Sequence, residues 1–69
     1  MRRHRGRMNG ERYLANSNTR EVHDLDSETR LCQIDEIINA RHDYPYTNLS
    51  TAHAAGYDNC AYCLGGSNR

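Results

Sequence analysis

Residues 56–63 read Gly-Tyr-Asp-Asn-Cys-Ala-Tyr-Cys and place Cys60 and Cys63 two residues apart near the end of the chain. One other cysteine, Cys32, lies far upstream. A Cys-x-x-Cys pair is compatible with a redox couple, a disulfide, half of a metal site or a reactive nucleophile. The choice between these four uses depends on the rest of the sequence.

The chain is too short and too polar to build a large hydrophobic core. It has 69 residues, no tryptophan, no phenylalanine and a mean hydropathy of −1.02. A domain of this size buries only roughly 60% of the surface of its unfolded chain, and it usually needs a disulfide, a metal or an oligomer for stability. We therefore expect a disulfide or a bound metal to stabilise the fold, and the cysteines are the candidate residues for it. The apolar candidates for the core are Leu14, Val22, Leu25, Leu31, Ile34, Ile37, Ile38 and Leu49.

The cysteine count and the lack of a sorting signal both favour reduced thiols. Three is an odd number, which fits a disulfide framework poorly. Residues 1–12 are charged and lack the apolar run of a signal peptide, and no stretch approaches the ~18 apolar residues of a membrane span. We therefore expect a cytoplasmic protein that has no membrane partner.

The charges are unevenly distributed, although the formal net charge is zero. Residues 1–12 hold five arginines and one acid, whereas the rest of the chain holds four arginines and eight acids. This pattern predicts a flexible basic N-terminal arm over residues 1–11. The arm offers four arginines to nucleic-acid phosphates, namely Arg2, Arg3, Arg5 and Arg7. The alternative is a disordered, solvated terminus without a binding role.

Local patterns predict a hairpin followed by a helix. Residues 12–16 and 20–23 flank turn-forming Asn and Ser residues, which predicts a β-hairpin. Leu31, Ile34, Ile37 and Ile38 form one apolar stripe at helical spacing, which predicts a helix over residues 28–40. Cys32 would then lie in the first turn or so of that helix.

The second half of the chain predicts a strand and a short helix. Residues 44–48 suit a strand that Pro45 confines to a sheet edge. Ser50 is expected to cap a helix over residues 51–55, and Gly56 to end it in left-handed backbone. The result is a small α+β domain over residues 12–64, in which a hairpin and an edge strand pack with two short helices. A C-terminal tail over residues 65–69 follows.

A structural metal is the best explanation for the three cysteines. Redox Cys-x-x-Cys motifs follow a strand within a βαβ framework, which the predicted elements do not supply. Structural zinc is tetrahedral and commonly takes three cysteines and one histidine. Cys60 and Cys63 offer two sulfurs within one tight turn, and Cys32 offers the third.

Four histidines are candidates for the fourth ligand. His4 lies in the arm, His42 is about three helical turns from Cys32, and His53 lies inside the short helix. His23 ends the second hairpin strand, and residues 24–31 form a loop that can return to Cys32, so His23 is the best candidate. Without the cysteines, each histidine would be interpreted as an ordinary surface or hydrogen-bonded side chain.

These residues also carry a family resemblance. The hairpin residues 13–18, then His23 and Cys32, and finally the stretch from Thr47 to Cys63 resemble the Ada-type metal-binding domain. The match covers about residues 12–64 and is most specific over residues 52–63, which read Ala-His-Ala-Ala-Gly-Tyr-Asp-Asn-Cys-Ala-Tyr-Cys. The resemblance implies one Zn2+ per chain, held by His23, Cys32, Cys60 and Cys63.

The chain departs from the DNA-repair members of that family. Their first ligand pair is Cys-x-x-x-Cys, and its first cysteine accepts a methyl group from an alkylated phosphate. Here His23 stands at the matching position, and eight residues separate it from Cys32. This loop carries three acids, at Asp24, Asp26 and Glu28, which would repel a phosphate backbone. We therefore expect a non-enzymatic zinc module, with methyl transfer to a zinc-bound thiolate as the alternative.

Two partner classes stay open at this point. Nucleic acid would bind through the basic arm, and a protein would bind through tyrosines such as Tyr44, Tyr46 and Tyr62. Tyrosines are enriched at interfaces, but they serve equally well to fill a small core. We expect the chain to be a monomer.

Overall fold

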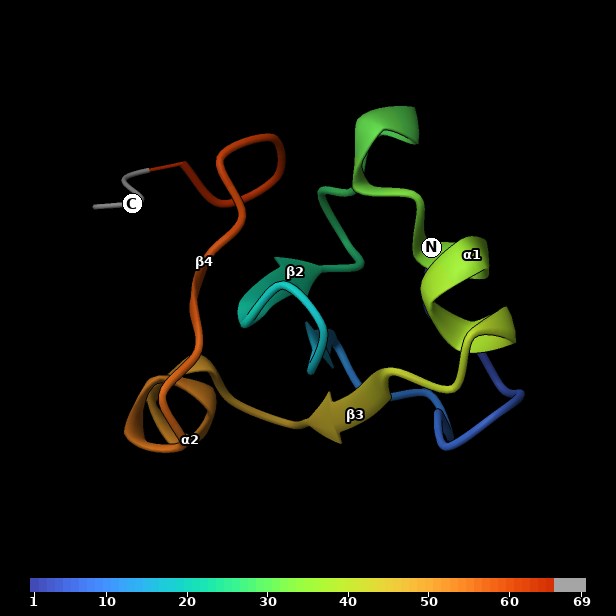
Figure 1. The fold of residues 1–69 in the computed structure, drawn as a ribbon, viewed down its shortest axis with the longest axis horizontal. Helices are drawn as coiled ribbons and strands as arrows, with labels where there is room; N and C mark the ends of the chain where they lie inside the picture. Colours follow the sequence, from blue (N-terminus) through green and yellow to red (C-terminus); the bar gives the residue numbers. More distant parts are fainter. Residues whose placement is uncertain (66–69) are drawn as a thin grey trace.

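A computed structural model describes residues 1–65 of the chain. These residues form a four-stranded sheet, two short α-helices and one 3-10 turn (Figure 1). The fold is therefore of the predicted α+β class. The strands are β1 (Tyr13–Asn16), β2 (Glu21–Asp24), β3 (Asp43–Tyr46) and β4 (Asp58–Asn59). The helical segments are η1 (Arg30–Cys32), α1 (Ile34–Asn39) and α2 (Leu49–Ala54).

The sheet has the strand order β3-β1-β2-β4. β1 pairs antiparallel with both β2 and β3, and β4 pairs parallel with β2. The predicted hairpin is therefore confirmed, and in its turn the Asn16 side chain accepts a hydrogen bond from the Asn18 amide. β3 is an edge strand, in agreement with the position of Pro45. β4 brings the chain back beside β2 immediately before Cys60.

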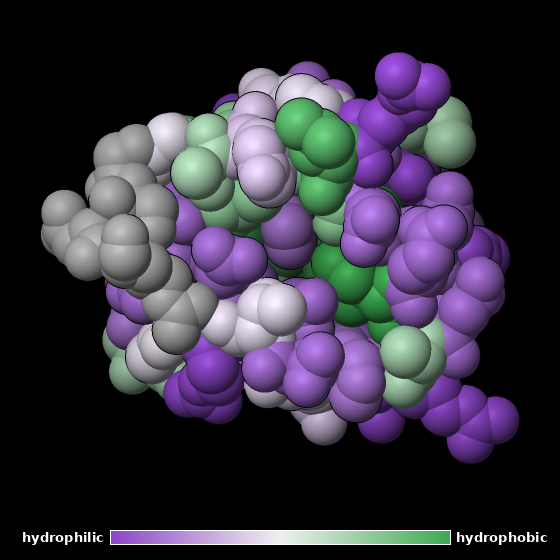
Figure 2. Space-filling view, turned by 45° about the horizontal axis from the view of Figure 1, so that its top comes forward, coloured by the Kyte–Doolittle hydropathy of each residue, from purple (hydrophilic) through white to green (hydrophobic). Residues whose placement is uncertain are grey.

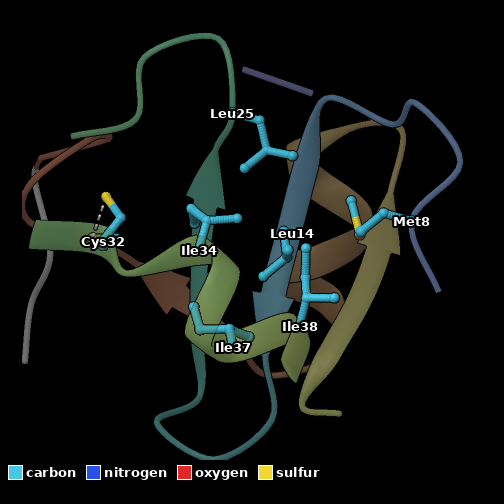
Figure 3. Close-up of a cluster of buried hydrophobic side chains, with 8 residues drawn as sticks. Met8, Leu14, Leu25, Cys32, Ile34, Ile37 and Ile38 are labelled. Atoms are coloured by element: carbon cyan, nitrogen blue, oxygen red, sulfur yellow. Dashed lines mark hydrogen bonds between the residues drawn. The ribbon is translucent and has the colours of Figure 1, made fainter. Parts of the chain in front are cut away.

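The sheet separates two small cores because successive residues of a strand point to opposite faces. On one face, Leu14 of β1 packs with Leu25 and with the three isoleucines of α1 (Figure 3). On the other face, Ala15 packs with Ala52 of α2. α1 and α2 accordingly lie on opposite sides of the sheet (Figure 1).

The predicted helix over residues 28–40 is wrong in its first half. Residues 30–32 form η1, Gln33 adopts left-handed backbone with φ 54°, and α1 begins only at Ile34. The Thr29 hydroxyl accepts a hydrogen bond from the Leu31 amide at 3.2 Å, a local bond that competes with helix formation. The break removes Leu31 from the apolar stripe. Leu31 is 65% exposed, whereas Cys32 is buried.

The short second helix begins earlier than predicted. The side chain of Asn48, and not that of Ser50, caps α2 by accepting a hydrogen bond from the Thr51 amide at 3.1 Å. Both residue types are good N-caps, so composition alone did not separate them. Gly56 follows the C-cap with φ 95°, which confirms the predicted left-handed end.

Residues 1–11, expected to be a flexible arm, instead lie against the body in this structure, and we call them the strap. Met8 is 3% exposed and belongs to the core cluster that contains Leu14 (Figure 3). At Gly6 an added Cβ atom would lie 2.7 Å from Ile38 Cγ2, so the strap backbone approaches α1 closely. The expectation of a flexible arm missed that one apolar side chain and the arginines tie the segment down.

Two further expectations concern the limits of the domain. No helix within residues 1–65 is long and apolar enough to cross a lipid bilayer. The predicted C-terminal tail, residues 65–69, lies outside the described residues from residue 66 onward. Gly65 is described, and its amide donates a hydrogen bond to the Cys60 carbonyl at 3.0 Å.

Candidate metal centre

The structure brings together the four residues that the sequence proposed as ligands. The ligand atoms of His23, Cys32, Cys60 and Cys63 all lie within 4.8 Å of one another. They come from three separate parts of the chain, namely β2, η1 and the turn after β4. In Figure 1 the green η1 and the orange-red turn after β4 lie on the same side of β2.

Backbone pairing of β4 with β2 positions the Cys-x-x-Cys turn beside His23. The Cys60 amide donates to the Val22 carbonyl at 2.9 Å, immediately next to His23. The Leu64 amide then donates to the Cys60 carbonyl at 2.9 Å and closes the turn that carries Cys63. Gly56 contributes at a distance, because its left-handed backbone leads the chain from α2 into β4. The pairing register of β4 with β2 thus determines where both sulfurs of the motif lie.

Cys32 reaches the cluster through the break that the sequence analysis missed. The left-handed Gln33 separates η1 from α1, and Cys32 ends η1 as a buried residue. The Thr29 hydroxyl lies 3.8 Å from the Cys32 sulfur. A continuous helix over residues 28–40 would have kept Leu31 on the buried stripe. The 3-10 turn instead buries Cys32 and exposes Leu31.

Two of the distances between ligand atoms fit a tetrahedral ion, and one sulfur–sulfur distance is too long for a disulfide. The Cys32 and Cys60 sulfurs are 3.8 Å apart, and the Cys63 sulfur is 3.8 Å from His23 Nδ1. Zn–S bonds of about 2.3 Å and Zn–N bonds of about 2.0 Å place neighbouring tetrahedral ligands about 3.5–3.8 Å apart. A disulfide would require about 2.05 Å between sulfurs. All three cysteines are free thiols.

Burial sets the protonation of the ligands. It lowers the pKa of His23 from 6.5 to about 4, so the imidazole is neutral at pH 7 and has a lone pair for a metal. Burial also raises the pKa of the Cys60 and Cys63 thiols. Thiolates at neutral pH therefore need a cation beside them, and metal binding would release protons. The Asp24 amide donates to the Cys63 sulfur at 3.3 Å, a hydrogen bond that would orient this ligand toward a bound ion.

The other three histidines lie outside this cluster. His53 Nε2 lies 2.6 Å from Asn59 Oδ1, so its ring is engaged by a neighbouring side chain. His42 follows α1 and lines a hollow beside the ligands without joining them. His4 belongs to the strap and is exposed. The choice of His23 among the four candidates agrees with this geometry.

The four strap arginines proposed for nucleic acid all meet carboxylates of the body. Arg2 makes a bidentate pair with Asp26, with N–O distances of 2.9 and 3.1 Å. Arg3 contacts both Glu28 and Asp35, and Arg5 contacts Asp35 at 2.9 Å.

Arg7 completes the set by contacting the buried Asp43. Its amide donates to Asp43 Oδ2 at 2.8 Å, and its guanidinium lies 3.6 Å from the same carboxylate. The guanidinium of Arg3 is the main cause that holds the pKa of both Glu28 and Asp35 below its usual value. The arm is thus neutralised by acids of the same chain, which the sequence did not foretell because any of eight downstream acids was available.

A hollow of ≈ 290 Å³ lies directly beside the candidate metal centre. Its walls include His23, Cys32 and Cys60, and the exposed side chains of Leu31 and Tyr62 also line it. Hydrophobic periodicity did not predict this hollow, since it places Leu31 in the core. The signal that was available was the position of Leu31 and Tyr62, each adjacent in sequence to a ligand cysteine.

Comparison with protein-family models, curated proteins and solved structures found no match to this chain. These comparisons give no support to the Ada-type resemblance, which stays a prediction from the residues quoted above, and the candidate metal centre depends on its geometry alone.

Proposed function

We propose that this chain is a structural zinc module: one Zn2+ holds the fold together, and the surface binds a protein partner. The observation that carries the proposal is the convergence of one imidazole and three thiols, three of these ligands being buried and Cys63 half-buried. Soft thiolates with one imidazole suit zinc better than magnesium or calcium, which prefer oxygen ligands.

A structural role follows from the number and burial of the ligands. Four protein ligands complete a tetrahedron, so no coordination position is left for water or substrate. Cys32 and Cys60 are 4% and 2% exposed. The ion would join β2, η1 and the final turn, which are far apart in the sequence. His23 and the three cysteines would hold it, and the Asp24 amide would fix Cys63.

The Ada-type resemblance supports the same proposal through the order of its elements. Hairpin, first ligands, helix, strand, short helix and Cys-x-x-Cys follow one another here as in that family. Membership of the histidine-containing branch of that family is part of this proposal. The methyl-acceptor reaction is not favoured, because His23 occupies the position of the accepting cysteine. Incubation with methylated DNA, followed by intact mass spectrometry, is expected to add no methyl mass to the chain.

A protein partner is favoured over nucleic acid by the strap. Arg2, Arg3, Arg5 and Arg7 are engaged by carboxylates, so a phosphate would have to displace these contacts. We therefore expect a single-stranded DNA titration at low salt to give the same weak affinity for the wild type and for Arg2→Ala/Arg5→Ala. A large loss of DNA affinity in the double variant would instead favour nucleic acid as the partner.

Native mass spectrometry tests the metal itself. The wild type purified with zinc should carry one ion per chain, and a chelator should remove it. His23→Ala is expected to weaken zinc binding about 10-fold or more, since it removes a ligand of the closed site. His42→Ala and His53→Ala are the matched controls and should retain the ion. A chain that binds no zinc, or loses it only with His53→Ala, would overturn the proposal.

A further inference from the structure

The hollow beside the metal centre has the features of a docking groove, and we call it the metal-side groove. It lies between η1 and α1 on one side and the hairpin turn and the Cys-x-x-Cys turn on the other. In Figure 2 hydrophobic surface is visible in the depth of a hollow that mostly hydrophilic side chains surround. At ≈ 290 Å³ the groove is at the lower end of small-molecule pockets, about 300 Å³, so its size suits a single long side chain.

Two large apolar side chains are exposed at this groove. Leu31 is 65% exposed and Tyr62 is 59% exposed, and both line it. Leu31 precedes the ligand Cys32, and Tyr62 lies between the ligands Cys60 and Cys63. Metal coordination would therefore fix the distance between the two side chains. Exposed apolar and aromatic residues held on a rigid support are typical anchors of protein interfaces.

The charge of the groove points to a cationic occupant. Glu21 and Glu36 line it, and no arginine does so among the described residues. Neither carboxylate forms an ion pair within residues 1–65, whereas the acids that face the strap, such as Glu28 and Asp35, are paired with arginines. Within residues 1–65, the acids on the strap side are thus paired with arginines, whereas the two carboxylates in the groove form no ion pair.

We propose that the metal-side groove binds a protein segment in which one arginine or lysine is flanked by apolar side chains. The cation enters between Glu21 and Glu36, and the apolar neighbours pack on Leu31 and Tyr62. A nucleic-acid strand fits poorly, because its phosphates would face the same two carboxylates. This inference rests on the proposed function, since the ion positions both apolar anchors.

A random heptapeptide library displayed on phage, selected on the zinc-loaded chain, is the first test. Selected peptides are expected to carry arginine or lysine with apolar residues on both sides. Enrichment of acidic peptides, or no enrichment at all, would overturn the inference.

Groove variants then locate the binding of a selected peptide, measured by fluorescence anisotropy. We expect the affinity for the peptide to fall about fivefold or more in each of two variants, Glu21→Gln/Glu36→Gln and Tyr62→Ala. This is a change in binding free energy of about 1 kcal/mol. Tyr44→Ala is the control, because Tyr44 is a 40% exposed tyrosine on β3 that does not line the groove. Equal weakening by Tyr44→Ala, or none by the groove variants, would place the peptide elsewhere and overturn the inference.

Zinc content measured in parallel separates this inference from the proposed function. If the zinc-loaded chain does not bind peptides with basic and apolar residues, the inference about the metal-side groove is wrong and the metal proposal still holds. A folded chain without zinc contradicts the metal proposal, while the peptide selection still decides the groove. Single-stranded DNA that displaces the selected peptide would show a phosphate site in the groove and overturn the inference.

Discussion

The candidate metal centre and the strap both join segments that are far apart in the sequence, but they do so by different physics. At the metal centre four buried or half-buried ligand atoms converge within 4.8 Å of one another. In the strap, guanidinium groups meet carboxylates at the surface, and the side chains of Arg2 and Asp26 are 47% and 42% exposed. Water and salt screen the second kind of contact far more than the first. We therefore expect the ion to govern folding and the strap to adjust stability.

Removal of the ion should produce the largest effect. Structural zinc contributes an apparent ~10–16 kcal/mol in finger-like peptides, which is comparable with the ~5–15 kcal/mol total stability of a domain. Adding a chelator to the zinc-loaded chain should abolish its sheet signal in circular dichroism and its dispersed amide resonances.

A high concentration of sodium chloride is the matched perturbation of the strap, and it should leave the same spectra in place. A chain that keeps its spectra after verified zinc loss would show that the apolar clusters alone hold the fold.

Met8→Ala should give the next largest effect. Met8 is the apolar anchor of the strap, and truncating a buried methionine to alanine typically costs about 2–5 kcal/mol. The urea midpoint of the zinc-loaded chain is the measurement. Met8→Leu conserves the volume and should cost less than about 1.5 kcal/mol. Equal urea midpoints for the wild type and Met8→Ala would show that Met8 does not hold the strap to the body, in agreement with the flexible arm expected from composition.

The contrast between the two regions also explains which features were accessible from the sequence. Ligand chemistry is scarce: with three cysteines and four histidines, the tetrahedral requirement leaves few combinations, and the structure brings the chosen four together. Possible ion pairs are numerous, because the rest of the chain offers eight acids as partners for each strap arginine. The sequence therefore predicted the cluster of one histidine and three cysteines, and it did not predict the contacts of the strap.

The helix break shows a second limit of sequence reasoning. Leu31 fits the apolar stripe of α1 by spacing. It nevertheless points outward, because its amide donates a hydrogen bond to the Thr29 hydroxyl and Gln33 adopts left-handed backbone. Such local competition between side chain and backbone leaves no trace in hydrophobic periodicity. The groove was missed for the same reason, since it depends on Leu31 being exposed.

Arg3→Gln should have a smaller, pH-dependent effect. Arg3 holds the pKa of Glu28 below 4.5 and that of Asp35 below 3.8. Because the folded-state pKa is depressed, the pairs stabilise the fold above about pH 4.5, and this stabilisation is lost as the pH falls through the folded-state values. The loss at pH 7 should be about 1 kcal/mol, since the pairs are only partly buried.

Chemical unfolding of wild type and Arg3→Gln, with zinc in excess, measures this difference across the acid range. The difference should begin to shrink as the pH falls below about 4.5 and should approach zero only once the pH is below the depressed folded-state pKa values of both carboxylates. A difference that stays constant with pH would assign the effect of Arg3 to packing of its aliphatic stem.

Arg2→Ala should have the smallest effect, although Arg2 makes a bidentate pair with good geometry. Both partners are half-exposed, and an exposed pair gains little over its hydrated ions. We expect no measurable change in the urea midpoint at physiological salt. If Arg2→Ala destabilises the chain as much as Met8→Ala does, a network of charges holds the strap. The expectation that the ion governs folding while the strap only adjusts stability would then be wrong.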